Sequence, residues 1–205
     1  MPIKKIIHKA GNCLYLMSKD FILSWTIPEY ICDEIIYYFK KNKNLHYKGV
    51  VQGKNNNIQN KDLKVSTDIS IDADNNNKPF SDYRNELQNC LNLYVETYPQ
   101  VNNLYRFNVL EPYNIQHYKK GEGFKAEHCE RNGSFNLSLK RCLVFMTYLN
   151  DVEDGGTKFI YQNRIIKAQK GKTLIWPSDW THTHCGQISK TQEKTIITGW
   201  FSYLW

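Results

Sequence analysis

The second half of the chain is a series of short strand-like segments separated by turn residues, and this pattern restricts the fold more than any other feature. The segments are residues 104–118, 141–149, 157–161, 164–168, 173–176 and 194–204. Short apolar or alternating runs bounded by glycine, proline and asparagine are typical of β-strands. Many short strands in succession predict a β-sandwich or a barrel.

The first half of the chain predicts two helices. Pro28 opens the first, which runs to about Lys41. The second spans about Ser81 to Tyr98, and Pro99 stops it. Each helix has an apolar face at helical spacing: Ile31, Ile35 and Phe39 in the first, and Phe80, Tyr83, Leu87, Leu91 and Tyr94 in the second. Residues 14–17, 21–25 and 63–71 are strand candidates, and the remainder of 42–77 is expected to form exposed loops.

Composition limits the classes of protein to which the chain can belong. Its 205 residues, 41% of them hydrophobic, suffice for one domain with a sizeable core. No apolar run approaches the roughly 18 residues of a membrane span, and the N-terminal stretch lacks the apolar region of a secretion signal. The six cysteines include no C-x-x-C pair, which favours reduced thiols and a cytoplasmic, intracellular location.

The net charge of +7 permits an acidic partner, nucleic acid included. Much of the excess is lysine in Asn/Lys-rich stretches, which is more typical of a solvated surface. Nucleic-acid binding is therefore compatible with the sequence but not favoured by it, and no membrane partner is expected.

His128-x-Glu130 and the more distant His184 are the most informative residues for function. Two imidazoles and one carboxylate are the ligands of the facial-triad site for non-haem Fe(II), which leaves the opposite face of the octahedron open. In an extended segment, alternate residues point the same way, so His128 and Glu130 could bind one ion while Cys129 points elsewhere. Alone, an H-x-E tripeptide is a weak signal.

Further motifs surround these residues in order. They are Tyr118-Lys-Lys-Gly121, the apolar strand from Cys142 to Asn150, Asp154-Gly-Gly-Thr-Lys-Phe159, Gly171 to Pro177, His184-Cys-Gly186, and Lys194 to Trp200. Over roughly residues 104 to 203, this order closely resembles the Fe(II)/2-oxoglutarate-dependent dioxygenases of the prolyl 4-hydroxylase-like group. One departure is Glu130, because the commoner pattern is H-x-D and the extra methylene would shift the metal slightly.

The resemblance implies a mainly β (α+β) fold: a double-stranded β-helix of the jelly-roll, cupin-like kind, buttressed by the N-terminal helices. Residues 1–205 would form a single domain, in which residues 1–103 supply strands and supporting helices and residues 104–205 form the dioxygenase core. Gly155-Gly156 resembles the family's turn before the next strand, and Gly171 is expected to mark a hairpin.

The resemblance also assigns roles to individual residues. His128, Glu130 and His184 would be the metal ligands and the catalytic residues, with His128 and Glu130 at the end of one strand and His184 on the opposite sheet. The C1 carboxylate and C2 keto oxygen of 2-oxoglutarate would chelate the iron. Its C5 carboxylate needs a cation, and Lys194 has the family offset from His184 for that role.

Three aromatic residues are further cofactor-binding candidates by the same resemblance. Tyr118 and Tyr148 match positions at which the family places phenols in the cosubstrate pocket, and Trp200 is the third. Ordinary core packing is the alternative for the two tyrosines. A solvated strand-edge charge is the alternative for Lys194.

Two histidines compete for the third ligand position. His182 and His184 have the same parity, so strand alternation cannot separate them. The family spacing favours His184, because Gly186, Lys194 and Trp200 then fall at the family's offsets. His182 is expected to be a rim residue near the substrate mouth, and His117 to be structural.

The implied enzyme is an oxidoreductase that uses Fe(II), 2-oxoglutarate and O2, with ascorbate (L-ascorbic acid) in assays. It would hydroxylate an unactivated C–H bond and release succinate and CO2. The resemblance favours a peptidyl proline or another protein side chain as substrate, hence a peptide or protein partner. Residues 42–62, 72–79 and 131–140 are expected as loops lining the substrate groove.

Alternatives remain open. The same chemistry could act on a free amino acid or a nucleic-acid base. A zinc hydrolase could use the same three ligands, but it would leave Lys194 and the strand order unexplained. A non-catalytic cupin-like binding module would have a broken triad, whereas this triad is complete.

Overall fold

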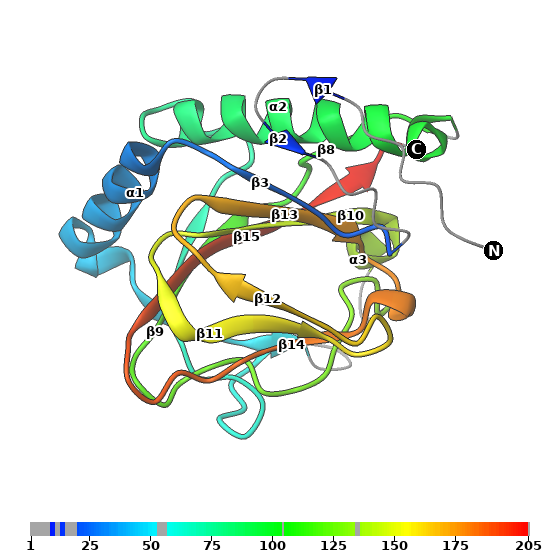
Figure 1. Cartoon of the computed structure of the whole chain (residues 1–205). Helices are drawn as coiled ribbons and strands as arrows, with labels where there is room; N and C mark the ends of the chain where they lie inside the picture. Colours follow the sequence, from blue (N-terminus) through cyan, green and yellow to red (C-terminus); the bar gives the residue numbers. More distant parts are fainter. Residues whose placement is uncertain are drawn as a thin grey trace.

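Two antiparallel sheets pack against each other, and two helices cover the outer face of the larger sheet (Figure 1). This computed structural model describes residues 9–10, 13–14, 20–52, 57–103, 105–133 and 136–204. Among these residues, no helix is long and apolar enough to cross a membrane. The arrangement confirms the mainly β, double-stranded β-helix prediction.

The large sheet has the strand order β3–β13–β10–β15–β9–β7–β4, and β8 pairs with the end of β15. Its strands are β3 (Leu23–Thr26), β4 (Tyr47–Lys48), β7 (Thr67–Ile71), β8 (Phe107–Asn108), β9 (Tyr113–Tyr118), β10 (Arg141–Tyr148), β13 (Lys172–Pro177) and β15 (Lys194–Tyr203). Since β3, β4 and β7 come from the first half of the chain, residues on both sides of position 103 share one sheet.

The small sheet has the order β12–β11–β14. Its strands are β11 (Val152–Phe159), β12 (Arg164–Ala168) and β14 (His184–Gly186). Gly155 and Gly156 lie within β11, at a register shift, so the expected turn is a bulge. A Cβ on Gly155 would lie 2.4 Å from Val152 Cγ1, and one on Gly156 would lie 2.3 Å from Ile166 O. Close packing, and not backbone torsion, excludes side chains there.

Gly171 lies between the two sheets and not in a hairpin. β12 belongs to the small sheet and β13 to the large one, so the expected pairing of these two strands is wrong. Gly171 has a φ of +78°, which a side chain would oppose. Its carbonyl accepts a hydrogen bond from Ile27 N and so ties the crossing to the start of α1.

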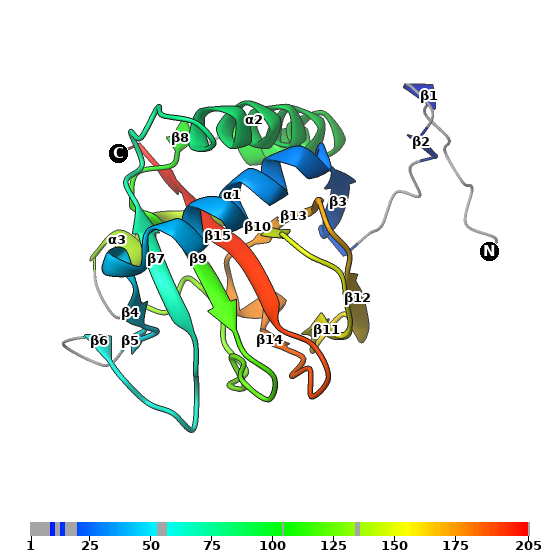
Figure 2. The same cartoon turned by 90° about the vertical axis from the view of Figure 1, so that its left-hand side faces the viewer.

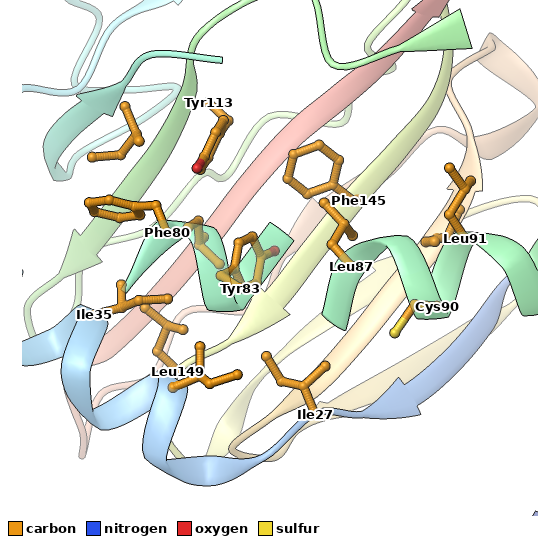
Figure 3. Close-up of a cluster of buried hydrophobic side chains, with 14 of the residues drawn as sticks. Ile27, Ile35, Phe80, Tyr83, Leu87, Cys90, Leu91, Tyr113, Phe145 and Leu149 are labelled. Carbon is orange, nitrogen blue, oxygen red and sulfur yellow. The ribbon is translucent and has the colours of Figure 1, made fainter. Parts of the chain in front are cut away.

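The helices α1 (Glu29–Lys41) and α2 (Phe80–Thr97) confirm both helix predictions. Their apolar faces pack on the outer face of the large sheet (Figure 2). Figure 3 shows side chains of α2, among them Tyr83 and Leu87, directed at Phe145 and Tyr113 of the sheet. This buried layer leaves the opposite face of the sheet for the functional site.

Strand alternation divides the side chains of β10 between two cores. Leu143 and Phe145 belong to the helix-facing core, whereas Val144, Met146 and Tyr148 belong to the core between the sheets. Successive side chains of a strand point to opposite faces, so one apolar run can serve both layers. The long, fully buried pattern of β10 follows from its central position.

Several short elements were not predicted. They are the helices η1 (Lys43–Leu45), η2 (Pro99–Asn102), η3 (Trp180–His182) and α3 (Asn136–Lys140), and the paired strands β1 (Lys9–Ala10) with β2 (Cys13–Leu14) and β5 (Val51–Gln52) with β6 (Asn57–Ile58). The expected loop at 131–140 thus includes α3. The strand expected at 63–71 begins only at Thr67. Of the candidate at 14–17, only Leu14 is within the described residues.

Candidate active site

The H-x-E and His184 motifs meet on short stretches of irregular backbone. His128 lies outside the named strands and forms an isolated antiparallel bridge with His184, the first residue of β14. The His128 N–H donates to His184 O at 3.0 Å, and the His184 N–H donates to His128 O at 2.9 Å. The prediction that they lie on opposite sheets is wrong, because the bridge makes the two histidines cross-strand neighbours.

The polar atoms of these side chains converge on one point. Glu130 Oε1 lies 3.3 Å from His128 Nε2 and 3.7 Å from His184 Nε2. One potential ligand atom from each residue lies within 4.8 Å of the others. His184 is buried, and His128 and Glu130 are partly exposed. Within the described residues, this is the one group of three such side chains that could hold a metal ion.

Backbone carbonyls fix the tautomer of both imidazoles. His128 Nδ1 lies 2.9 Å from Ala126 O, and His184 Nδ1 lies 2.9 Å from His182 O. A carbonyl oxygen only accepts hydrogen bonds, so each Nδ1 carries a proton, and Nε2 is the ring nitrogen that can offer a lone pair to a metal ion. This is the arrangement that histidine ligands of metal ions use.

The electrostatics of the group favour a bound cation. Burial lowers the pKa of His184 to about 4, so this ring is neutral at pH 7. Burial opposes ionisation of Glu130, but the nearby His128, His184 and Arg141 hold its pKa below the ordinary value. A lone pair and a carboxylate oxygen therefore face each other, which is unfavourable unless a cation lies between them. The donor set fits Fe(II) or Zn(II).

The second carboxylate oxygen of Glu130 is held by residues of the large sheet. Trp200 Nε1 donates to Glu130 Oε2 at 2.8 Å. Arg141 stacks on the Trp200 ring at 3.5 Å, donates to Glu130 O at 3.0 Å, and forms a buried two-bond ion pair with Glu111. The sequence prediction missed Arg141 and Glu111. No local pattern marks a pair whose members are 30 positions apart.

Lys194 is a buried cation at the other end of the site. Its Nζ donates to Gly155 O at 2.9 Å and to Gln187 O at 2.8 Å. No carboxylate of the described residues forms an ion pair with it, and burial lowers its pKa to about 8. Lys194 is therefore not a solvated edge charge. A buried cation paired only with carbonyls can accept an anionic ligand.

The two predicted phenols line the same pocket as this lysine. The Tyr118 ring is 5.3 Å from Lys194 Nζ, and its hydroxyl donates to Gln116 Oε1 at 2.6 Å. The Tyr148 hydroxyl lies 2.6 Å from Thr157 Oγ1. Both rings are buried, so each packs in the inter-sheet core and also lines the pocket described below.

His182 is not a rim residue, contrary to the prediction. It ends η3, is 4% exposed, and its Nε2 lies 2.8 Å from Asp20 O. The parity argument did not apply, because η3 and not a strand precedes His184. His117 does not line the pocket described below, and its Nδ1 lies 3.0 Å from Thr195 Oγ1, which agrees with the predicted structural role.

A pocket of about 470 Å³ joins the two ends of the site. The predicted site residues all line it: His128, Glu130, His184, Lys194, Tyr118, Tyr148 and Trp200. It continues over polar side chains of β7 and β9, including Ser70, Asn114 and Gln116. Of the three loops expected at a groove, 42–62 and 131–140 contribute lining residues, whereas 72–79 contributes none.

Comparison with known families and structures agrees with this geometry. Residues 113–202 match the profile of the 2OG-Fe(II) oxygenase superfamily. This segment runs from β9 almost to the end of β15, and it contains every predicted site residue. No curated protein sequence matches the chain.

Solved prolyl hydroxylases have the same fold. A Pseudomonas putida prolyl-4-hydroxylase is 12% identical, with a TM-score of 0.65, over 91% of this chain and 95% of that one. A viral collagen prolyl hydroxylase of Paramecium Bursaria Chlorella virus-1, in complex with 2OG, is 16% identical, with a TM-score of 0.64, over 91% and 98%. A Trichoplax adhaerens prolyl hydroxylase, in complex with a hypoxia inducible factor peptide fragment, is 14% identical, with a TM-score of 0.67, over 90% and 84%.

Proposed function

We propose that this chain, whose residues 113–202 match the 2OG-Fe(II) oxygenase superfamily and whose fold is that of prolyl hydroxylases, is a 2-oxoglutarate-dependent oxygenase that hydroxylates a peptide or protein, with a prolyl side chain as the first candidate. The observation that carries the proposal is the single pocket that joins three convergent ligand atoms to a buried, uncompensated lysine. That combination suits a metal ion at one end and a dicarboxylate between the two.

His128, Glu130 and His184 would hold the Fe(II). The Nε2 atoms of the two histidines and Oε1 of Glu130 would supply three ligands, which leaves positions for the keto acid and O2. Bound iron would supply the redox chemistry of the superfamily, in which 2-oxoglutarate and O2 give succinate and CO2, with one oxygen atom retained in succinate and the other inserted as hydroxyl into a C–H bond. The protein orients the ligands and excludes water.

Lys194 would bind the C5 carboxylate of 2-oxoglutarate. The support is its burial beneath the pocket, with two carbonyl partners but no carboxylate partner among the described residues. An incoming carboxylate would stabilise the charged form of a lysine whose pKa burial has lowered to about 8. Tyr118 and Tyr148 would enclose the carbon chain of the cosubstrate.

The polar extension of the pocket supports a peptide as prime substrate. Ser70, Asn114 and Gln116 offer hydrogen-bond donors and acceptors within the same pocket, which suits the amide groups of a peptide. The Trichoplax adhaerens relative, of the same fold, is in complex with a peptide fragment. No feature of the described residues favours a nucleic-acid base over a peptide.

The test is turnover with defined substrates. Purified protein with Fe(II), ascorbate and 2-oxoglutarate should form succinate slowly alone and faster with proline-rich peptides, which should gain the mass of one oxygen atom. His128→Ala should form none. If free proline but not peptides accelerates succinate formation, the substrate is a free amino acid and not a peptide. Metal binding without any succinate formation would favour a hydrolase or a binding module.

A further inference from the structure

We infer that Trp200, Arg141 and Glu111 are positioning residues that adapt this site to a glutamate ligand, so that an aspartate at position 130 cannot replace it. The inference rests on the proposed metal site. It explains the one departure of the chain from the H-x-D pattern. It also gives Trp200 a role different from cosubstrate binding.

Glu130 is held at both ends of its carboxylate. Oε1 faces His128 and His184, whereas Oε2 accepts the indole N–H of Trp200 at 2.8 Å. The second oxygen is thereby occupied, so Glu130 offers one oxygen to a metal. The extra methylene of glutamate is what lets one carboxylate reach both the imidazoles and the indole, since the backbone of residue 130 is fixed by its N–H to Ser178 O at 3.1 Å.

Arg141 holds Trp200 and the Glu130 backbone together. Its guanidinium carbon lies 3.5 Å from the centroid of the Trp200 ring, and its Nη1 donates to Glu130 O at 3.0 Å. It is 4% exposed, and Glu111, 6% exposed, accepts two of its hydrogen bonds at 2.8 and 2.6 Å. A buried, bidentate pair of this kind fixes the plane of the guanidinium. The indole N–H is therefore aimed at Oε2 before any metal arrives.

The charge of this assembly also fits a positioning role. Arg141 forms its two-bond ion pair with Glu111 and not with Glu130, so the carboxylate of Glu130 stays available to a cation. Arg141 Nη1 lies 3.7 Å from Glu130 Oε2, farther than a hydrogen bond, and leaves that oxygen to the indole. Removing the partners that orient a ligand commonly weakens metal affinity by about 10- to 100-fold.

The experiment is a double-mutant cycle read by Co(II) affinity, measured from the visible absorption of the full chain at pH 7.5. Trp200→Phe keeps the aromatic stack but removes the N–H, and it should weaken Co(II) binding by about 10- to 100-fold. Glu130→Asp should weaken it at least as much. The double variant should bind within about twofold of Glu130→Asp alone, because the shortened carboxylate no longer reaches the indole.

Two further variants control for packing. Trp25→Phe removes a buried indole N–H that has no hydrogen-bond partner among the described residues, on β3 outside the pocket lining, and should keep wild-type affinity. Arg141→Lys keeps the charge for Glu111 but loses the flat guanidinium, and it should weaken Co(II) binding by about tenfold; it serves also if Trp200→Phe does not fold. Circular dichroism and thermal unfolding of the metal-free proteins establish folding.

The possible outcomes distinguish failure of the proposed metal site from failure of the positioning role. Absence of Co(II) binding by the wild type, or equal binding by His128→Ala, would refute the proposed metal site and the positioning role with it. Normal wild-type binding with Trp200→Phe indistinguishable from Trp25→Phe, or with additive losses in the double variant, would leave the metal site standing and overturn the positioning role.

Discussion

The metal end of the pocket (His128, Glu130 and His184) and its lysine end (Lys194, Tyr118 and Tyr148) are built in different ways. The lysine end stands on long, regular strands, where Lys194 on β15 pairs in register with Tyr118 on β9. At the metal end, His128 lies in an isolated bridge, Glu130 in a bend and His184 in the three-residue strand β14. Strand register sets the side-chain direction at the lysine end, and bonds to Gly155 O and Gln187 O then hold Lys194 Nζ.

The metal end needs a separate hydrogen bond for each ligand. Carbonyls orient both imidazoles, and Trp200 orients Glu130. A site whose ligands come from irregular backbone keeps its geometry only through such partners. Substitutions at the metal end should therefore change metal binding, whereas those at the lysine end should change cosubstrate binding and leave the metal in place.

The largest expected effect distinguishes the two neighbouring histidines. His184→Ala should abolish Co(II) binding, because a ligand is lost. His182→Ala should retain Co(II) binding and instead lower the free energy of unfolding by about 1–3 kcal/mol, because it leaves Asp20 O without its buried partner. Metal titration and chemical denaturation measure the two effects. Loss of metal binding in His182→Ala alone would move the metal end to that residue.

The second effect tests the lysine end. Lys194→Ala should weaken 2-oxoglutarate binding to the Mn(II)-loaded protein by at least about a hundredfold, since an unpaired buried charge costs about 3–5 kcal/mol. Mn(II) affinity should stay within about twofold. Lys158→Ala, an exposed lysine on β11, is the matched control. Calorimetric titration measures both affinities, and an unchanged 2-oxoglutarate affinity would show that the anchor lies elsewhere.

The regular part of the molecule was predictable from sequence, for a physical reason. The apolar faces of α1 and α2 and the apolar run of β10 are local patterns of the sequence, and they predict these elements without knowledge of tertiary contacts. Local periodicity reports which side of an element is buried. Periodicity therefore predicts the buried face of an element correctly where that element is long.

The irregular part was predictable only in outline. The motif gave the identities of His128, Glu130 and His184, but strand parity failed around His182 because η3 interrupts the strand. The Arg141–Glu111 pair and the isolated bridge depend on contacts between distant residues, which leave no periodic trace. Gly155 was predicted to lie in a turn, whereas its close packing against Val152 depends on tertiary contacts that the sequence does not show.

A smaller effect is the pH dependence of the lysine end. Burial lowers the pKa of Lys194 from 10.5 to about 8, so the free protein loses this charge as the pH rises above 8. The dissociation constant of 2-oxoglutarate should then rise by about tenfold per pH unit. Since the unfolded chain binds the extra proton between pH 8 and 10.5, the contribution of Lys194 to stability rises over that window, so its titration does not unfold the protein.

The control for this pH profile is Lys194→Arg, which stays charged throughout. Its 2-oxoglutarate affinity, measured with the Mn(II)-loaded protein, should be flat between pH 7 and 9, whatever its absolute value. A parallel decline in Lys194→Arg would assign the pH dependence to the metal end.

The smallest expected effect concerns the phenol of Tyr148. Its hydroxyl already shares a 2.6 Å hydrogen bond with Thr157 and lies 3.4 Å from Ile166 O, so it is not poised for the cosubstrate as Lys194 is. Tyr148→Phe should weaken 2-oxoglutarate binding by at most about tenfold and lower the free energy of unfolding by about 1 kcal/mol, because Thr157 loses its partner. Calorimetric titration and denaturation separate the two losses. A hundredfold weaker affinity at unchanged stability would instead make the phenol, and not the lysine, the main attachment point, and the contrast between one charged anchor and its neutral surroundings would then be wrong.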